Sequence, residues 1–308
     1  MPGSASGSRR VAAALALAFA LVDAAPGLAW SRPGHMVTAA IAWRDLEDAP
    51  ALRARIAYLL AAHPDRAPFE VAIDRSTNEE QVRRRFYECA RWPDDARGTV
   101  YDHPSWHYAA QALIRDGRPA SVGSKGSAID AFALNINVLR DPSATKAEQA
   151  VALCWVLHIV GDLHQPLHTG ELFSRDYPEG NRLGALQYVR ASPSAEPVTL
   201  HWYWDDAVHQ SGTLSSVEAR ATELVVRYPQ ARDYNDPLAV SHWAYDESFP
   251  MLASLAYGPS LRSGRSPETA PVVSDDYRRA VQEAAELRAV GAGHRIAAVL
   301  RALFGSVE

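Results

Sequence analysis

The alternation of apolar and polar residues along the chain predicts helices over most of its length. The clearest of these segments, Lys146 to His168, reads KAEQAVALCWVLHIVGDLHQPLH. Thr145 followed by Glu148 has the spacing of a helix capping box. The apolar run Ala150 to Val160 suits a buried helix, and Pro166 ends it. We therefore expect a long, buried helix in the middle of the chain.

Other stretches with helical periodicity are the segment after Trp30, residues 50–90, Asp130 to Arg140, Ser215 to Tyr228, Val240 to Tyr257 and Asp275 to Phe304. The segment Thr169 to Pro197 is rich in Gly, Pro and Ser, and so long a connection in a compact domain is usually functional or disordered. No stretch indicates a convincing strand, and no repeat of fixed period occurs. We predict an all-α fold, with residues 30–308 forming a single mainly helical domain.

The N-terminal residues 1–29 have the composition of a secretory signal peptide. A pair of arginines precedes the apolar run Val11 to Val22, and small residues at Gly27 and Ala29 form a cleavage signature. The run is too short to span a bilayer comfortably, and no later stretch approaches that length. We expect a mature chain that begins at Trp30 and is exported, to the periplasm or outside the cell, without a membrane partner.

Composition narrows the class further. The chain has 308 residues, 47% hydrophobic and 22% charged, which is typical of a globular protein. Its net charge of −5 argues against a broad basic surface for duplex nucleic acid, although bound cations would make a local field positive. Cys89 and Cys154 are its only cysteines, so we expect no disulfide framework. Whether the two pair stays open, and Cys154 is interpreted as a small buried hydrophobe.

Candidate chemistry begins on the central helix, where His158 and Asp162 are four positions apart and project from one face. Burying both is costly unless something binds them, either a divalent metal ion or a hydrogen bond within the helix. His168 follows just past the helix end and can turn back toward the same cleft. His201 and Asp205 repeat the four-residue spacing. Two such pairs in one chain favour the metal interpretation.

Two further segments contain residues of metal-ligand type. The stretch RWPDDARGTVYDHPSWHYAA is expected to be irregular and contains Asp94, Asp95, Arg97, Asp102, His103 and His107. At the expected mature start, the amine and carbonyl of Trp30 could bind a metal ion together with His35. The alternative is an aromatic anchor next to a helix cap. His63 and His103 are expected at the surface, and His164, His242 and His294 are interpreted as packing or surface residues.

Order and spacing of these residues follow one pattern: W-x4-H from Trp30, W-x-D from Trp92, then His107, H-x3-D-x5-H from His158 and H-x3-D from His201. This pattern resembles the zinc-dependent, single-strand-specific nucleases of fungi and plants, the S1/P1 nuclease family, over essentially the whole mature chain. The resemblance implies a mainly helical fold with three Zn²⁺ ions in a cleft. It also implies an endonuclease that cuts single-stranded DNA or RNA to 5′-phosphates and hydrolyses 3′-mononucleotides.

The resemblance also assigns residues to roles. It gives one zinc ion to Asp94, His107, His158 and Asp162, a second to His168, His201 and Asp205, and a third to Trp30, His35 and the shared Asp162. Arg97 and Asp162 are implied in catalysis, Tyr108 in stacking against a base and Asn181 in nucleotide binding. Ala110 stands where the family has an aspartate that hydrogen-bonds the base, so base preference and the choice between RNA and DNA stay open.

Two alternatives remain. Zinc phospholipases C share the fold class and a similar ligand set, but a lipid headgroup would want an acidic or aromatic choline pocket. Arg97, Tyr108 and Asn181 favour the nuclease. A non-enzymatic exported zinc-binding protein is the other alternative, although zinc buffers usually have flexible His-rich or acidic tracts. No obligate protein partner is evident.

Overall fold

The computed structural model describes residues 30–65, 67–70, 78–116, 126–208, 211–232 and 237–305. The proposed signal peptide, residues 1–29, lies outside the described residues. Helices dominate these ranges, which confirms the predicted all-α class. None of the helices within them is long and apolar enough to cross a membrane.

The longer helices are α1 (Arg32–Asp45), α2 (Pro50–Leu60), α4 (Asn78–Asp95), α5 (Ala128–Arg140), α6 (Lys146–Asp162), α8 (Leu214–Arg227) and α11 (Asp275–Phe304). Shorter helices are α3 (Ala67–Glu70), α7 (Leu200–Asp205), α9 (Val240–His242) and α10 (Phe249–Met251). The 3-10 turns are η1 (Pro104–His107), η2 (Pro166–His168), η3 (Arg182–Gly184), η4 (Pro229–Arg232) and η7 (Pro267–Thr269). Two π-helical turns, η5 (Trp243–Ser248) and η6 (Leu252–Ala256), adjoin α9 and α10, so the helix expected over Val240 to Tyr257 is continuous but partly π-helical.

The expectation of no strands was wrong. β1 (Gln111–Ile114) pairs in parallel with β2 (Gly170–Phe173), starting at Gln111 opposite Gly170. β3 (Tyr188–Val189) and β4 (Val198–Thr199) form a two-stranded antiparallel pair. Strands of two to four residues are too short to show a period of two in the sequence. The long connection after His168 is therefore partly ordered, because it contains β2, η3 and β3.

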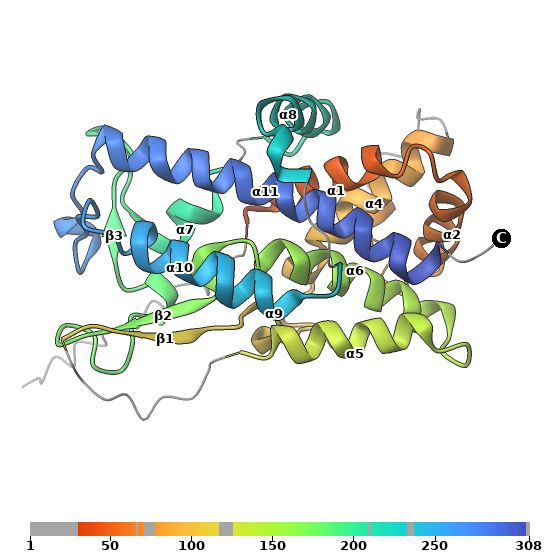
Figure 1. Ribbon diagram of the computed structural model, residues 1–308, viewed down its shortest axis with the longest axis horizontal. Coiled ribbons are helices and arrows are strands. Elements are labelled where there is room, and N and C mark those ends of the chain that lie inside the picture. The colour runs from red at the N-terminus through yellow and green to blue at the C-terminus, as the bar shows by residue number, and fades with distance from the viewer. Residues whose placement is uncertain are drawn as a thin grey trace, which may run out of the picture.

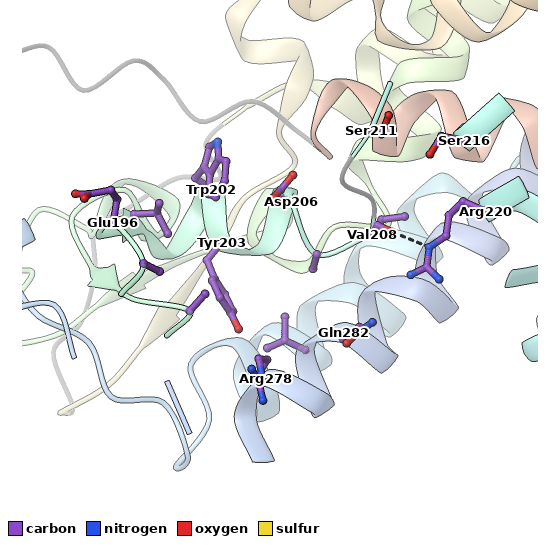
Figure 2. A pocket seen from close by; sticks show the side chains of 15 residues that line it. Glu196, Trp202, Tyr203, Asp206, Val208, Ser211, Ser216, Arg220, Arg278 and Gln282 are labelled. Atoms are coloured by element: carbon purple, nitrogen blue, oxygen red, sulfur yellow. Dashed lines mark hydrogen bonds between the residues drawn. The ribbon is translucent and has the colours of Figure 1, made fainter. Parts of the chain in front are cut away.

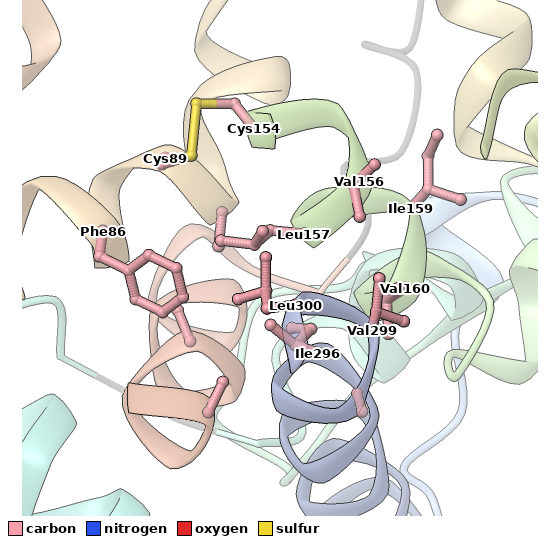
Figure 3. Close-up of a cluster of buried hydrophobic side chains, with 14 of the residues drawn as sticks. Phe86, Cys89, Cys154, Val156, Leu157, Ile159, Val160, Ile296, Val299 and Leu300 are labelled. Carbon is pink, nitrogen blue, oxygen red and sulfur yellow. A yellow bond between two sulfur atoms is a disulfide. The ribbon is translucent and has the colours of Figure 1, made fainter. Parts of the chain in front are cut away.

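The core forms where α6 meets α4, α1 and α11, and α11 runs along the length of the molecule (Figure 1). Phe86 of α4, Leu157 of α6 and Leu300 of α11 are fully buried in this core (Figure 3). A side chain at Gly293 of α11 would place its Cβ 2.6 Å from Cβ of Ile41 in α1. The glycine thus lets these two helix backbones approach closely.

The capping box predicted for α6 is confirmed. The hydroxyl of Thr145 accepts a hydrogen bond from the backbone N–H of Glu148, and the Glu148 carboxylate accepts one from the N–H of Thr145 at 2.8 Å. Two backbone N–H groups at the start of the helix, those of Thr145 and Glu148, therefore have hydrogen-bond acceptors. Its final turn lies inside the protein, with His158 and Asp162 fully buried.

A disulfide links α4 to α6, between Cys89 and Cys154, and both cysteines are fully buried (Figure 3). The sequence left open whether the two cysteines pair, and the structure pairs them; the predicted burial of Cys154 is confirmed. No spacing rule pairs two cysteines that are 65 residues apart, because the partners meet only when the helices pack. The bond joins α6, which contains the buried His158, to α4.

We expect the double variant Cys89→Ala/Cys154→Ala to fold but to lose about 2–4 kcal/mol of unfolding free energy, because a cross-link over 65 residues restricts the unfolded chain. Urea unfolding, monitored by circular dichroism with and without a reductant, measures this loss. The reductant should weaken the wild-type protein and leave the variant unchanged. Equal midpoints for both oxidised proteins would contradict the prediction.

Candidate metal centre

The end of α6 supplies the two residues around which the site is built. Nε2 of His158 lies 3.2 Å from Oδ2 of Asp162. Nδ1 of His107, from η1, lies 2.9 Å from the same His158 nitrogen and 3.1 Å from the same carboxylate oxygen. Zinc–ligand bonds of 2.0–2.1 Å in a tetrahedron imply ligand atoms about 3.3 Å apart. These three atoms already have nearly that separation.

Asp94 and His35 complete this side of the cluster. Oδ1 of Asp94 lies 3.9 Å from both Nδ1 of His107 and Nε2 of His158. The other oxygen of Asp162, Oδ1, faces away from His107 and lies 3.3 Å from Nε2 of His35. The two oxygens of Asp162 therefore point into two neighbouring positions, which is the geometry required of a bridging carboxylate.

Trp30 is buried against the same helix end. Its indole N–H donates to the carbonyl of Gly161 at 2.9 Å, and the next residue, Ser31, donates its backbone N–H to the carbonyl of Asp205 at 2.7 Å. Gly161 has no room for a side chain, because a Cβ would lie 2.7 Å from Nδ1 of His35. The start of the expected mature chain is thus held between α6 and α7.

A third group lies beside the first two and is formed by His168 of η2 with His201 and Asp205 of α7. Nε2 of His201 is 3.6 Å from Oδ2 of Asp205, and Nε2 of His168 is 3.9 Å from Oδ1. Gln165 donates a hydrogen bond to Oδ1 of Asp205 at 2.7 Å and so orients the carboxylate. Ligand atoms lie within 4.8 Å of one another in three sets of side chains: His35, Asp94 and His158; His107, His158 and Asp162; and His168, His201 and Asp205.

Backbone carbonyls determine which nitrogen of the histidines faces inward. The Nδ1–H of His158 donates to the carbonyl of Ala90 at 2.8 Å, and that of His168 to the carbonyl of His107 at 2.7 Å. His201 donates in the same way to the carbonyl of Leu183 at 2.7 Å. Each of these bonds fixes a tautomer whose Nε2 has a free lone pair, the usual second-shell arrangement of a metal site.

Comparison with known proteins identifies the family of this chain. The family model described as S1/P1 Nuclease matches residues 30–305. The chain belongs to the S1/P1 nuclease family. Endonuclease 4 of Arabidopsis thaliana is 28% identical over 169 residues, 50% of this chain and 51% of that protein. Nuclease S1 of Aspergillus oryzae is 27% identical over 195 residues, 58% of this chain and 62% of that protein. The chain thus spans between half and two thirds of the length of these relatives.

The donor set of this S1/P1 family member fits zinc. Several buried side-chain atoms of the cluster have no hydrogen-bond partner among the described residues: both ring nitrogens of His35, Nε2 of His107, His168 and His201, Oδ2 of Asp94 and Asp205, and Oδ1 of Asp162. Leaving so many buried polar atoms unpaired is costly. Imidazole nitrogens and carboxylate oxygens are ligands of catalytic zinc sites, so zinc would satisfy Nε2 of His35, His168 and His201 and the unpaired oxygens of Asp94, Asp162 and Asp205.

The pKa shifts of the predicted ligands are those expected of a site that binds cations. Burial lowers the pKa of four imidazoles below its usual value: His35, His107 and His168 well below it, and His201 to about 4. Burial raises the pKa of Asp162 to about 7 and that of Asp205 well above its usual value. These four imidazoles are neutral and can donate a lone pair. His158 differs, because the carboxylates of Asp162 and Asp94 outweigh its burial and raise its pKa. Bound cations would offset the cost of burying the charged carboxylates, and they would compete with protons for these ligands.

The structure therefore brings the eight predicted histidine and aspartate ligands into one cluster and places the side chain of Trp30 against the same helix end, although their binding of metal stays a prediction. Asp94 and Asp95 are on α4, not in an irregular segment, and the helix extends to them although it contains Pro93. Asp95 is ion-paired with Arg32 and Arg91. His103 is half-buried and stacks on Trp106, at a ring-centroid distance of 3.8 Å.

The predicted substrate residues have different surroundings. Arg97 donates to Oδ1 of Asp94 at 3.0 Å, so it borders the metal cluster. Tyr108 is half-buried, with its ring centroid 4.8 Å from that of His168. Asn181 is fully buried and makes its side-chain hydrogen bonds inside the protein.

His63 was expected at the surface, and this was wrong: it is buried between Phe69 and Trp92. His164 is a packing residue, as expected. It is fully buried, and its Nε2 accepts a hydrogen bond from Arg295 at 2.7 Å.

An ionic network that no sequence pattern indicated lies behind the ligand-bearing turn after α6. Glu247 of η5 accepts hydrogen bonds from Arg295 at 2.8 and 2.5 Å and from Arg288. Arg288 also donates to the carbonyl of His164, and Ser248 donates to that of Leu163 at 2.7 Å. This network fastens residues 163 and 164 to α11, and so positions the turn that leads to His168.

The opposite face of α7 lines a cavity of about 840 Å³ (Figure 2). Trp202, Tyr203 and Asp206 border it from α7, and Arg278 borders it from α11. Its wall contains both carboxylates and guanidinium groups and none of the nine predicted ligands. The metal centre therefore lies on the other side of α7 from this cavity.

We expect removal of metal with a chelator to lower the melting temperature markedly, because the buried ligand atoms lose the ions that satisfy them. Elemental analysis of the untreated protein should find close to three zinc ions per chain. Calorimetry before and after dialysis against a chelator, followed by zinc addition, measures the effect. A melting temperature that does not respond to chelation or to added zinc would contradict the prediction.

Proposed function

We propose that this protein is an exported zinc-dependent phosphodiesterase that cuts single-stranded nucleic acids and hydrolyses 3′-mononucleotides. One observation carries the proposal: three neighbouring sets of buried imidazole and carboxylate groups lie together, with Arg97 and Tyr108 at their border. The names of the relatives, an endonuclease and a nuclease, support the same reaction class.

Three zinc ions would be held by the three sets. His107, His158, Asp162 and Asp94 would hold one, and His168, His201 and Asp205 a second. His35, the second oxygen of Asp162 and the amine and carbonyl of Trp30 would hold the third, once residues 1–29 are removed during export to the periplasm or the medium. Zinc bound there would polarise phosphoryl oxygens and lower the pKa of water to about 7.

Asp162 and Arg97 are the residues of this chain that act on the reacting phosphate. Asp162 presents one oxygen to each of two neighbouring sets of imidazoles, so its negative charge would hold cations bound at both. Burial opposes the charge of Arg97, but Asp94 raises the pKa of its guanidinium above the usual value. The side chain is 20% exposed. A guanidinium that stays charged and reachable can donate two hydrogen bonds to phosphoryl oxygens and stabilise charge in the transition state.

Tyr108 supplies a surface for a nucleobase. Its ring lies against His168 and within 6.2 Å of the ring centroid of His201, so a stacked base would hold its phosphate near the second zinc set. Stacking of a base on an aromatic ring tolerates any sequence, because every base has a π face. It also requires an unstacked base, which explains a preference for single strands over duplexes.

Asp162→Asn should abolish nearly all hydrolysis, because the neutral amide no longer bridges two cations. The assay compares zinc-supplemented protein on single-stranded DNA, duplex DNA, RNA, 3′-AMP and phosphatidylcholine. The wild type should cut single strands much faster than duplex, and the variant should lose activity on every ester. Preferential hydrolysis of phosphatidylcholine would instead support the phospholipase alternative and refute the nuclease proposal.

Tyr108→Ala should mainly weaken the binding of nucleotides, by about 1–3 kcal/mol for the lost stack, because it leaves the ligand residues intact. KM for single-stranded DNA should rise while turnover of bis(p-nitrophenyl) phosphate stays near the wild-type rate. Tyr108→Phe retains the ring and serves as the matched control. An equal loss of turnover on both substrates would show that the ring supports the catalytic groups and does not bind a base.

A further inference from the structure

Gln165 is a fully buried residue that lies between two predicted metal ligands in the chain, Asp162 and His168. Its backbone N–H donates to the carbonyl of Asp162 at 3.0 Å, and its own carbonyl accepts the backbone N–H of His168 at 3.0 Å. The backbone of Gln165 therefore joins the last residue of α6 to the first ligand of the His168, His201 and Asp205 site.

The side chain of Gln165 adds a link to a third predicted ligand. Its Oε1 accepts the backbone N–H of Leu167 at 2.5 Å, which fixes the start of η2. Because a backbone N–H can only donate, the oxygen of the amide must face Leu167 and the nitrogen must face the other way. There Nε2 donates to Oδ1 of Asp205 on α7 at 2.7 Å. One buried amide thus connects the turn that carries His168 to the carboxylate of Asp205.

This connection leaves the two oxygens of Asp205 in different situations. Oδ1 accepts the hydrogen bond from Gln165, whereas Oδ2 has no hydrogen-bond partner among the described residues and lies 3.6 Å from Nε2 of His201. A carboxylate that is held by one oxygen presents the other in a fixed direction, which is how outer hydrogen bonds orient metal ligands. Without the amide, the Asp205 carboxylate could rotate away from His201.

The turn that contains Gln165 is also held from its other side. Ser248 donates to the carbonyl of Leu163 at 2.7 Å, and Arg288 donates to that of His164 at 3.3 Å. Neither contact involves the side chain of Gln165, so the backbone should keep its path when that side chain is replaced. We therefore expect the effect of a substitution to be confined to the hydrogen bonds with Leu167 and Asp205.

We propose that Gln165 is a positioning residue that fixes the His168, His201 and Asp205 site and sets its place relative to Asp162. The proposal rests on the proposed zinc centre. Gln165 acts through the ligands and does not touch substrate, because its side chain is 0% exposed. Asp162 is shared by two of the predicted metal positions, and Gln165 ties the remaining position to them.

The test is the zinc affinity of Gln165→Met, in which an unbranched side chain of similar volume replaces the amide and makes neither hydrogen bond. Titration of the zinc-loaded protein with a chelating indicator should show one of three ions leaving at a chelator concentration about 10- to 100-fold lower than in the wild type. Turnover of single-stranded DNA and of bis(p-nitrophenyl) phosphate should fall together at low zinc and recover when zinc is added. KM for the DNA should stay unchanged once zinc is saturating.

Gln149→Met is the matched control. Gln149 lies at the other end of α6, is 6% exposed and donates its amide to the carbonyl of Asp141 at 3.1 Å, so the same substitution removes a comparable hydrogen bond away from the centre. It should lower the melting temperature without changing zinc affinity.

If Gln165→Met does not fold, Gln165→Asn replaces it. Asparagine readily accepts the backbone N–H two residues ahead, so it retains the bond to Leu167. Its side chain is shorter by a methylene group, which withdraws the donor from Asp205. The same ion should again leave at a lower chelator concentration than in the wild type.

Unchanged zinc affinity in Gln165→Met, or in Gln165→Asn where that variant replaces it, would overturn the proposal. So would an equal loss of zinc affinity in Gln149→Met, because that result would assign the effect to general destabilisation. A raised KM for DNA at saturating zinc would also contradict it. A wild-type protein that binds no zinc would refute the metal centre and this proposal together, so the two failures are distinguishable.

Discussion

The buried carboxylate of Asp162 is the constraint on which the rest of the site depends. A fully buried carboxylate is costly without a positive partner, and the groups nearest to it are imidazoles, most of which burial keeps neutral. Each oxygen of Asp162 faces a different set of nitrogens. Cations on both sides would satisfy Asp162 and draw His35, His107 and His158 around it. The two predicted metal positions that share Asp162 are therefore one connected structure and not two independent sites.

The surrounding protein holds the predicted ligands in a fixed geometry through backbone carbonyls, a disulfide and ion pairs. Carbonyls of Ala90, His107 and Leu183 hold three of the imidazoles by Nδ1. The disulfide joins Cys89, which precedes Ala90 on α4, to Cys154, one turn before His158 on α6. It therefore holds the imidazole of His158 next to the carbonyl that accepts its hydrogen bond. The turn after α6 is held in place by the ion pairs of Glu247 with Arg288 and Arg295.

Most of the fold could be read from the sequence. Spacing on a helix predicts that His158 shares a face with Asp162 and that His201 shares one with Asp205, and the structure places both pairs together. The other predicted ligands, such as Asp94 and His107, were assigned by the resemblance to the nuclease family. The disulfide, the burial of His63 and the Glu247 network could not be read, because they arise from contacts between segments far apart in the chain.

The long helix α11 contributes no predicted ligand, yet it packs on α1 and α6 and supplies the two arginines that hold the turn before His168. All nine predicted ligands lie between Trp30 and Asp205, so they are synthesised well before α11 begins at Asp275. A growing chain can therefore contain every ligand residue and still lack the surface against which they are arranged. The order of the sequence itself delays assembly of the predicted metal centre until α11 is available.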